Sequence, residues 1–147
     1  MFFLSKLDLK LDRLKVYELL MYHDVPEIYA GDTVLHPEII QDNKSKFEKE
    51  MLAAKKLREE LPHPLNDKFF KLFEEYEAKE SREAKFAKAI DALESEIHEM
   101  DYKEDWRGWT PEFLTQKKAH LFADFPELKK VFFELLDYLK ENGYFDQ

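Results

Sequence analysis

The stretch SREAKFAKAIDALESEIHEM, residues 81–100, decides the fold class. Its large apolar side chains recur three or four residues apart, at Phe86, Ile90, Leu93 and Ile97. This spacing lines one face of an α-helix and differs from the strict alternation of a strand. One carboxylate, Asp91, lies among these apolar residues. We therefore predict a helix from Ser81 to about Met100 with an acidic group on or near its buried face.

Helical spacing also runs through most of the remaining chain. It predicts further helices from Leu11 or Asp12 to His23-Asp24, from Lys44 to Glu60, from Asn66 to Ala78, from Pro111 to Ala123, and from Pro126 to Asn142-Gly143. Pro111 and Pro126 suit the first position of a helix. No stretch predicts a convincing strand, an internal repeat or a linker. The expected architecture is one all-α domain of five or six helices over residues 1–147.

Composition excludes several classes of function. The formal net charge of −9 gives no basic excess for binding the backbone of a nucleic acid, so no nucleic-acid partner is expected. The chain has no cysteine, which excludes disulfides, thiolate metal sites and thiol catalysis. No apolar run approaches the roughly 20 residues of a spanning helix, and the start MFFLSK does not resemble a signal peptide. We expect a cytoplasmic protein that does not associate with membranes.

Potential metal-binding and catalytic side chains concentrate in YHDVPEIYAGD, residues 22–32. Four of them could donate oxygen or nitrogen to a site: His23, Asp24, Glu27 and Asp32. His23 and Asp24 at the end of a helix can reach one ion, and Glu27 follows one turn later if the helix continues. The alternative is a helix cap beside a solvated charge.

Asp91 also allows two interpretations. A partly buried carboxylate needs a partner, and Lys88 is three residues earlier on the same helical face. Either Lys88 is that structural partner, or Asp91 binds a metal ion while Lys88 lies near a substrate phosphate. The residues alone leave both interpretations open.

Taken in order, these motifs resemble the HD-domain metal-dependent phosphohydrolases, and within them the 5′-deoxynucleotidase branch. The resemblance covers about residues 14–100. It is carried by His23-Asp24-x-x-Glu27, Gly31-Asp32, Glu75-Tyr76-Glu77, Ser81-x-Glu83-Ala84-Lys85 and Lys88-x-x-Asp91. It implies that His23, Asp24 and Asp91 bind a divalent cation, and that Glu27 and Asp32 serve catalysis or substrate binding.

The resemblance also implies a mechanism and partners. The ion would be Mn, Co, Fe, Ni, Zn or Mg, because imidazole, carboxylate and water suit all of them. Lys88 and Lys85 would complement the phosphate of a small phosphorylated metabolite, a nucleotide in that branch, and the products would be a nucleoside and inorganic phosphate. A homodimer is expected as well.

This chain departs from the family pattern at its start. The pattern begins with a further metal-binding histidine on an earlier helix, and no histidine precedes His23. Divergence, a late start codon and a truncated chain all remain open as explanations. Of the other histidines, His36 is the best substitute by position; the rest are His63, His98 and His120.

Three functions follow as alternatives. The first is a phosphohydrolase for a (deoxy)nucleoside 5′-monophosphate or a similar ester. The second is a non-catalytic HD-domain remnant that acts as a ligand-binding or dimerising scaffold. The third is an interaction protein whose last helix binds a partner through Phe132, Phe133, Leu136 and Tyr138, a pattern that is more often ordinary core.

Overall fold

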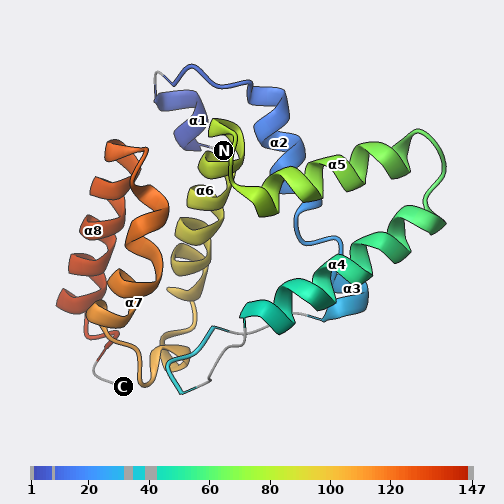
Figure 1. Cartoon of the computed structure of the whole chain (residues 1–147). Helices are drawn as coiled ribbons and strands as arrows, with labels where there is room; N and C mark the ends of the chain where they lie inside the picture. Colours follow the sequence, from blue (N-terminus) through green and yellow to red (C-terminus); the bar gives the residue numbers. More distant parts are fainter. Residues whose placement is uncertain (1, 8, 32–34, 39–42, 146–147) are drawn as a thin grey trace. The chain divides into compact units, whose positions relative to one another are not determined.

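The computed structural model describes residues 2–7, 9–31, 35–38 and 43–145, and within these ranges it is all-helical without a strand (Figure 1). The longer helices are α2 (Arg13–Tyr22), α4 (Asn43–Glu60), α5 (Leu65–Ala78), α6 (Arg82–Glu99), α7 (Pro111–Lys118) and α8 (Pro126–Glu141). The shorter ones are α1 (Phe2–Lys6), α3 (Glu27–Ala30) and the 3₁₀ helices η1 (Lys103–Trp106) and η2 (Ala119–Phe122). The predicted all-α class is confirmed.

The chain forms two compact units. One, here called the α2–α5 unit, comprises residues 10–35 and 39–87; the other, here called the α7–α8 unit, comprises residues 1–9, 36–38 and 88–147. Helix α6 contributes its first residues to the α2–α5 unit and the remainder to the α7–α8 unit. The assignment of residues 1–147 to one domain stays a prediction.

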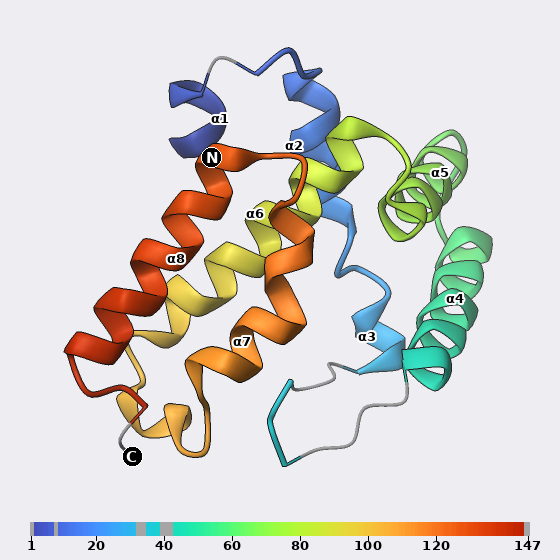
Figure 2. The same cartoon turned by 60° about the vertical axis from the view of Figure 1, so that its left-hand side comes forward.

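Helix α5 is the centre of the α2–α5 unit. It packs against α2 and against α4, and α3 packs against α4; α4 and α5 lie side by side as a helical hairpin (Figures 1 and 2). Two clusters of buried side chains hold the unit together. The first contains Leu19, Leu72, Tyr76, Ala84 and Ala87, and the second contains Ala54, Leu57, Phe69, Phe70 and Phe73. All the aromatic side chains of α5, together with Leu72, are therefore buried in this unit.

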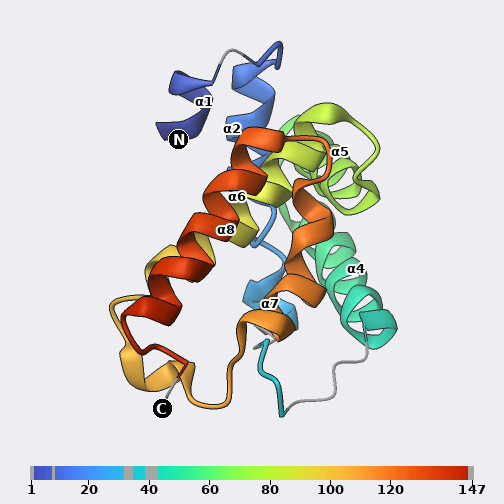
Figure 3. The same ribbon diagram turned by 90° about the vertical axis from the view of Figure 1, so that its left-hand side faces the viewer.

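The α7–α8 unit is built around aromatic side chains. Helices α7 and α8 run in opposite directions and are joined at η2, which packs against both (Figure 3). Trp106 is buried and donates a hydrogen bond from Nε1 to the Glu99 carbonyl oxygen, 2.9 Å away. On α8, Phe132 and Leu136 belong to the core, whereas Phe133 and Tyr138 are exposed. Two of the four residues considered for binding a partner therefore pack in the core of the unit.

An ion pair is buried in the same unit, between α6 and α7. Lys118 Nζ binds Glu96 Oε1 and also donates to Ser95 Oγ at 2.8 Å and to the Ala92 carbonyl at 3.3 Å. The side chains of Lys118 and Glu96 are only 12% and 4% exposed. Burial raises the pKa of the Glu96 carboxyl, and the attraction of Lys118 offsets this only in part.

None of the described helices combines the length and the apolar character needed to cross a bilayer.

Candidate metal centre

Helix α2 positions the His23-Asp24 pair. Asp12 caps its start by accepting a hydrogen bond from the Lys15 amide at 3.1 Å, and Leu19 anchors its buried face in the core. The helix ends at Tyr22, and the His23 amide donates to the Leu19 carbonyl at 3.1 Å as its C-cap. His23 therefore leaves the helix at its last turn, one residue before the solvent-exposed Asp24.

Two contacts hold the His23 imidazole. Nδ1 lies 2.8 Å from the Leu20 carbonyl oxygen, and the ring centroid is 4.7 Å from that of Tyr76 with the planes tilted by 43°. Because a carbonyl can only accept, Nδ1 carries the proton of this hydrogen bond. In a neutral ring the other nitrogen, Nε2, is then the hydrogen-bond acceptor.

His23 Nε2 faces the carboxylate of Asp24 at 3.0 Å from Oδ1. A neutral imidazole has one N–H group, and in His23 this group donates to the Leu20 carbonyl. Nε2 of His23 and Oδ1 of Asp24 are then two acceptors that face each other, unless a second proton or a cation lies between them. Ligands about 2.1 Å from an ion and at right angles are roughly 3 Å apart. With His23 11% exposed and Asp24 65% exposed, the pair fits a divalent cation that enters from solvent.

A polar network braces the same helices. Lys15 Nζ on α2 is 2.6 Å from Glu75 Oε1 on α5, and Ser81 donates to that oxygen as well. Ser81 Oγ also caps α6 by accepting from the Ala84 amide at 3.1 Å. Although partial burial acts to raise the pKa of the Glu75 carboxyl, the hydrogen bonds from Lys15 and Ser81 lower it overall. Glu75 in turn raises the pKa of Lys15.

Glu27 does not continue the helix of His23, contrary to one of the sequence alternatives. Residues 23–26 form a turn in which the Val25 amide donates to Tyr22 and the Glu27 amide donates to Asp24. Glu27 then begins the short helix α3, which ends at Gly31 with φ of +76°. The helix therefore does not continue from His23 to Glu27, and Glu27 lies on a new helix after Pro26. Asp32 lies outside the described residues.

Asp91 is bound to Lys88. Lys88 Nζ donates to Asp91 Oδ2 at 2.8 Å, and both side chains are about one third exposed. The partnership predicted from their spacing is confirmed. Asp91 and Lys88 belong to the α7–α8 unit, whereas His23, Asp24 and the exposed Lys85 belong to the α2–α5 unit. The described residues include no group of three or more His, Asp or Glu arranged for a metal ion, and the three-residue ligand set stays a prediction.

The histidine suggested as a substitute ligand has other contacts. His36 Nδ1 accepts from the Glu38 amide at 3.2 Å and its Nε2 donates to the Arg107 carbonyl at 3.3 Å. The ring also packs edge-on against Trp109. Since both nitrogens are engaged, His36 anchors residues 36–38 to the loop after η1 and does not offer a ligand atom.

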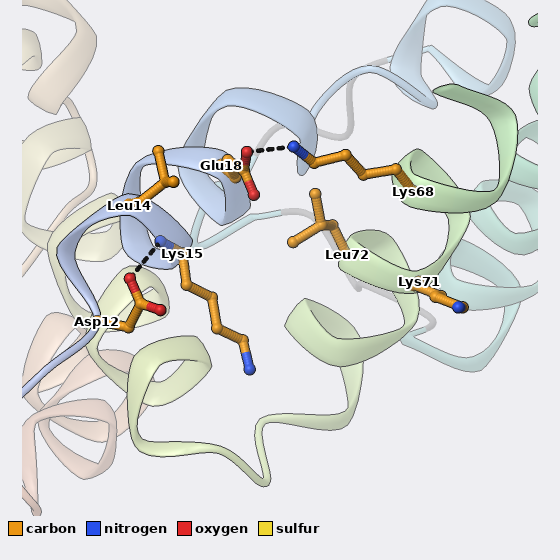
Figure 4. A pocket seen from close by; sticks show the side chains of 7 residues that line it. All are labelled: Asp12, Leu14, Lys15, Glu18, Lys68, Lys71 and Leu72. Carbon is orange, nitrogen blue, oxygen red and sulfur yellow. Dashed lines mark hydrogen bonds and ion pairs between the residues drawn. The ribbon is translucent and has the colours of Figure 1, made fainter. Parts of the chain in front are cut away.

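A separate open cavity of about 330 Å³ lies between α2 and α5 (Figure 4). It is lined by Asp12, Leu14, Lys15, Glu18, Lys68, Lys71 and Leu72. Lys15 and Lys68 are paired with Glu75 and Glu18, and Lys71 extends away from the other lining side chains. The positive charge of this cavity is therefore largely compensated, and among the described residues none of those predicted for the metal site lines it.

Comparison with known proteins assigns the family. The HD domain family matches residues 1–129. The chain is similar to a crystal structure described as a predicted metal-dependent phosphohydrolase from Magnetospirillum magnetotacticum MS-1, with 30% sequence identity and a TM-score of 0.78. The match covers 97% of this chain and 72% of the Magnetospirillum chain. No functionally curated protein matches the chain. Because the family match extends over most of the sequence and agrees with the fold, this chain belongs to the HD-domain family.

Proposed function

We propose that the chain is a metal-dependent phosphohydrolase that releases inorganic phosphate from a small phosphomonoester, specifically a (deoxy)nucleoside 5′-monophosphate. One observation carries the proposal: His23 Nε2 and Asp24 Oδ1 face each other at 3.0 Å, while Nδ1 of the same ring donates its hydrogen bond to the Leu20 carbonyl. Membership of the HD-domain family, and similarity to a protein described as a predicted metal-dependent phosphohydrolase, support it.

The proposed ligands are His23, Asp24 and Asp91. They would hold one of Mn, Co, Fe, Ni, Zn or Mg, and such an ion supplies an activated water and compensation of the phosphate charge. The Nδ1 hydrogen bond to the Leu20 carbonyl keeps His23 in the tautomer that leaves Nε2 free of a proton.

The remaining roles belong to residues around this centre. Glu27 accepts a proton from the attacking water or protonates the leaving oxygen, and Asp32 contacts the sugar or assists that proton transfer. Lys88, now bound to Asp91, contacts the substrate phosphate together with Lys85. In an acidic chain these two lysines supply local positive charge where the phosphate binds.

The test is phosphate release by the full chain. The protein is stripped with a chelator, reloaded with each ion in turn, and assayed on a panel of nucleoside and non-nucleoside monophosphates. We expect metal-dependent turnover with a preference for a nucleotide. Asp91→Ala is expected to abolish both turnover and stoichiometric metal binding. Asp137→Ala, which removes an exposed carboxylate of α8, should leave both unchanged. Full activity in Asp91→Ala would reject this ligand set.

A second candidate function is a non-catalytic HD-domain scaffold that binds a ligand or dimerises. The observation that favours it is the Lys88–Asp91 ion pair, since a carboxylate with its own lysine needs no metal ion. The same assay separates the two candidates. Absence of both stoichiometric metal and turnover with every ion supports the scaffold, and metal-dependent turnover rejects it.

A homodimer is part of the proposal. Helix α2 exposes Leu14 and Met21 by about two thirds and Tyr17 by 45%, and their spacing places them on one helical face. A second copy covering this face would remove apolar area from water. Sedimentation of the wild-type chain should give the mass of two copies, and Met21→Glu should shift it to one; a wild-type monomer at high concentration would reject the dimer.

A further inference from the structure

The ring of Tyr76 packs beside the His23 imidazole within the α2–α5 unit. It is 2% exposed, and its centroid is 4.7 Å from that of His23. This separation lies within the range in which aromatic rings attract each other. Tyr76 comes from α5, whereas His23 ends α2. The contact therefore links the ring of a proposed metal ligand to a different helix.

The imidazole needs such a contact because its own rotamer does not set the ring plane. The second side-chain torsion of histidine is broad and roughly two-fold, so a ring flip, which places Nδ1 where Cδ2 was and Nε2 where Cε1 was, has little intrinsic cost. The hydrogen bond to the Leu20 carbonyl favours one of the two orientations. The buried Tyr76 ring beside the imidazole, tilted by 43° to it, restricts the remaining rotation and so keeps Nε2 beside Asp24.

Tyr76 is itself held firmly. It packs in one cluster with Leu19 and Leu72, and the preceding residue, Glu75, is bound by both Lys15 and Ser81. The ring of Tyr76 is thus fixed from α2, α5 and the start of α6. A rigid second group of this kind is what keeps a metal ligand in its binding geometry.

We infer that Tyr76 is a positioning residue of the metal centre: its buried ring sets the plane of the His23 imidazole so that Nε2 faces Asp24. The inference rests on the proposed function only where it concerns a metal ion. The orientation of His23 itself can be measured without one.

The first measurement uses the metal-free chain. Long-range ¹H–¹⁵N correlation spectra under alkaline conditions should show His23 with its proton on Nδ1, and nuclear Overhauser contacts should join the ring protons of His23 and Tyr76. In Tyr76→Leu we expect the His23 signals to average between the two tautomers. Tyr76→Phe keeps the ring and should retain the wild-type pattern.

The second measurement is divalent metal affinity by calorimetry with Mn²⁺ and Co²⁺. Loss of an outer contact to a ligand typically weakens binding 10- to 100-fold, so Tyr76→Leu should bind at least about tenfold more weakly and Tyr76→Phe like wild type. The matched control is Phe73→Leu, which removes another buried ring of α5, one that packs in the other cluster. It should change neither the His23 spectrum nor the affinity.

Several results would overturn the inference. They are absent Overhauser contacts in the wild-type chain, an unchanged His23 spectrum in Tyr76→Leu, an equal effect of Phe73→Leu, or a loss in Tyr76→Phe as large as in Tyr76→Leu. If the wild-type chain binds no divalent ion while Tyr76→Leu still frees the His23 ring, the proposed metal centre fails and the positioning role of Tyr76 stands.

Discussion

Removing the cation from the buried ion pair of the α7–α8 unit should cost most near neutral pH. The substitution is Lys118→Met, which keeps the length of the aliphatic stem and deletes the charge beside Glu96. The Glu96 side chain is 4% exposed, so water cannot replace the lost ammonium group. An isolated carboxylate in such a place takes up a proton instead of remaining charged.

The size of the loss follows from that proton. Between the ordinary carboxyl pKa of 4.5 and about pH 7, holding a carboxyl group protonated costs about 3.4 kcal/mol, at 1.36 kcal/mol per pH unit. This is the ceiling of the electrostatic loss. Part of this electrostatic cost is already present in the wild-type protein, because burial raises the pKa of Glu96 even beside Lys118. We expect Lys118→Met to lower the free energy of unfolding by about 2–3 kcal/mol near pH 7.

The pH dependence has a definite sign. A carboxyl group with a raised pKa binds more protons in the folded than in the unfolded chain, so stability falls as pH rises from 4.5 through the raised value. The variant raises that pKa further. Its deficit relative to wild type should therefore shrink as the pH is lowered to 4.5 and below, where the carboxyl group becomes protonated in the folded and the unfolded chain alike.

The assay is urea unfolding followed by helical circular dichroism at neutral and at mildly acidic pH, with unchanged m-values as a condition. Lys117→Met is the matched control, because the neighbouring Lys117 is exposed; it should change stability by less than about 0.5 kcal/mol. A deficit in Lys118→Met below about 1 kcal/mol near pH 7, or one that does not shrink on acidification, would refute the reasoning.

Three further outcomes are expected. His23→Gln should weaken divalent metal binding at least about tenfold in calorimetry, while His63→Gln, at a side chain 78% exposed, should not; equal affinities would contradict the assigned ligand. Glu75→Gln should lower the free energy of unfolding by about 1 kcal/mol at neutral pH, with part of the Lys15 attraction screened by solvent. Because the folded pKa of Glu75 is lowered, this difference should disappear as pH falls from 4.5 through that value, and a constant difference would argue against the ion pair. Phe132→Ala, at a fully buried ring, should cost about 3–5 kcal/mol in the same urea assay, and a loss under 1 kcal/mol would show that the core refills the space.

The helices could be predicted because their determinants are local. Buried residues on α5, such as Phe69, Phe73 and Tyr76, recur three or four residues apart, and Thr110-Pro111 marks the start of α7 with a cap and a proline. The Lys88–Asp91 pair was accessible for the same reason, since one turn of a single helix separates the two residues.

The end of α2 was harder to place. The apolar spacing continues through Ile28, and nothing in it shows that the helix stops at Tyr22 and that a new one begins at Glu27. Pro26 tolerates either outcome, since a proline fits a first turn as well as a kink. The relation of Glu27 to His23 therefore depended on a backbone turn that periodicity does not encode.

By itself the sequence determined that this chain is helical, that Phe69, Phe73 and Tyr76 line the buried side of one helix, and that His23-Asp24 lies at the end of another. These properties depend on neighbours within one or two helical turns. Tertiary structure alone brought the Tyr76 ring of α5 against the His23 imidazole, and the Lys15 ammonium of α2 to the Glu75 carboxylate of α5. Contacts between residues so distant in the chain form only when the helices pack, and no local pattern records them.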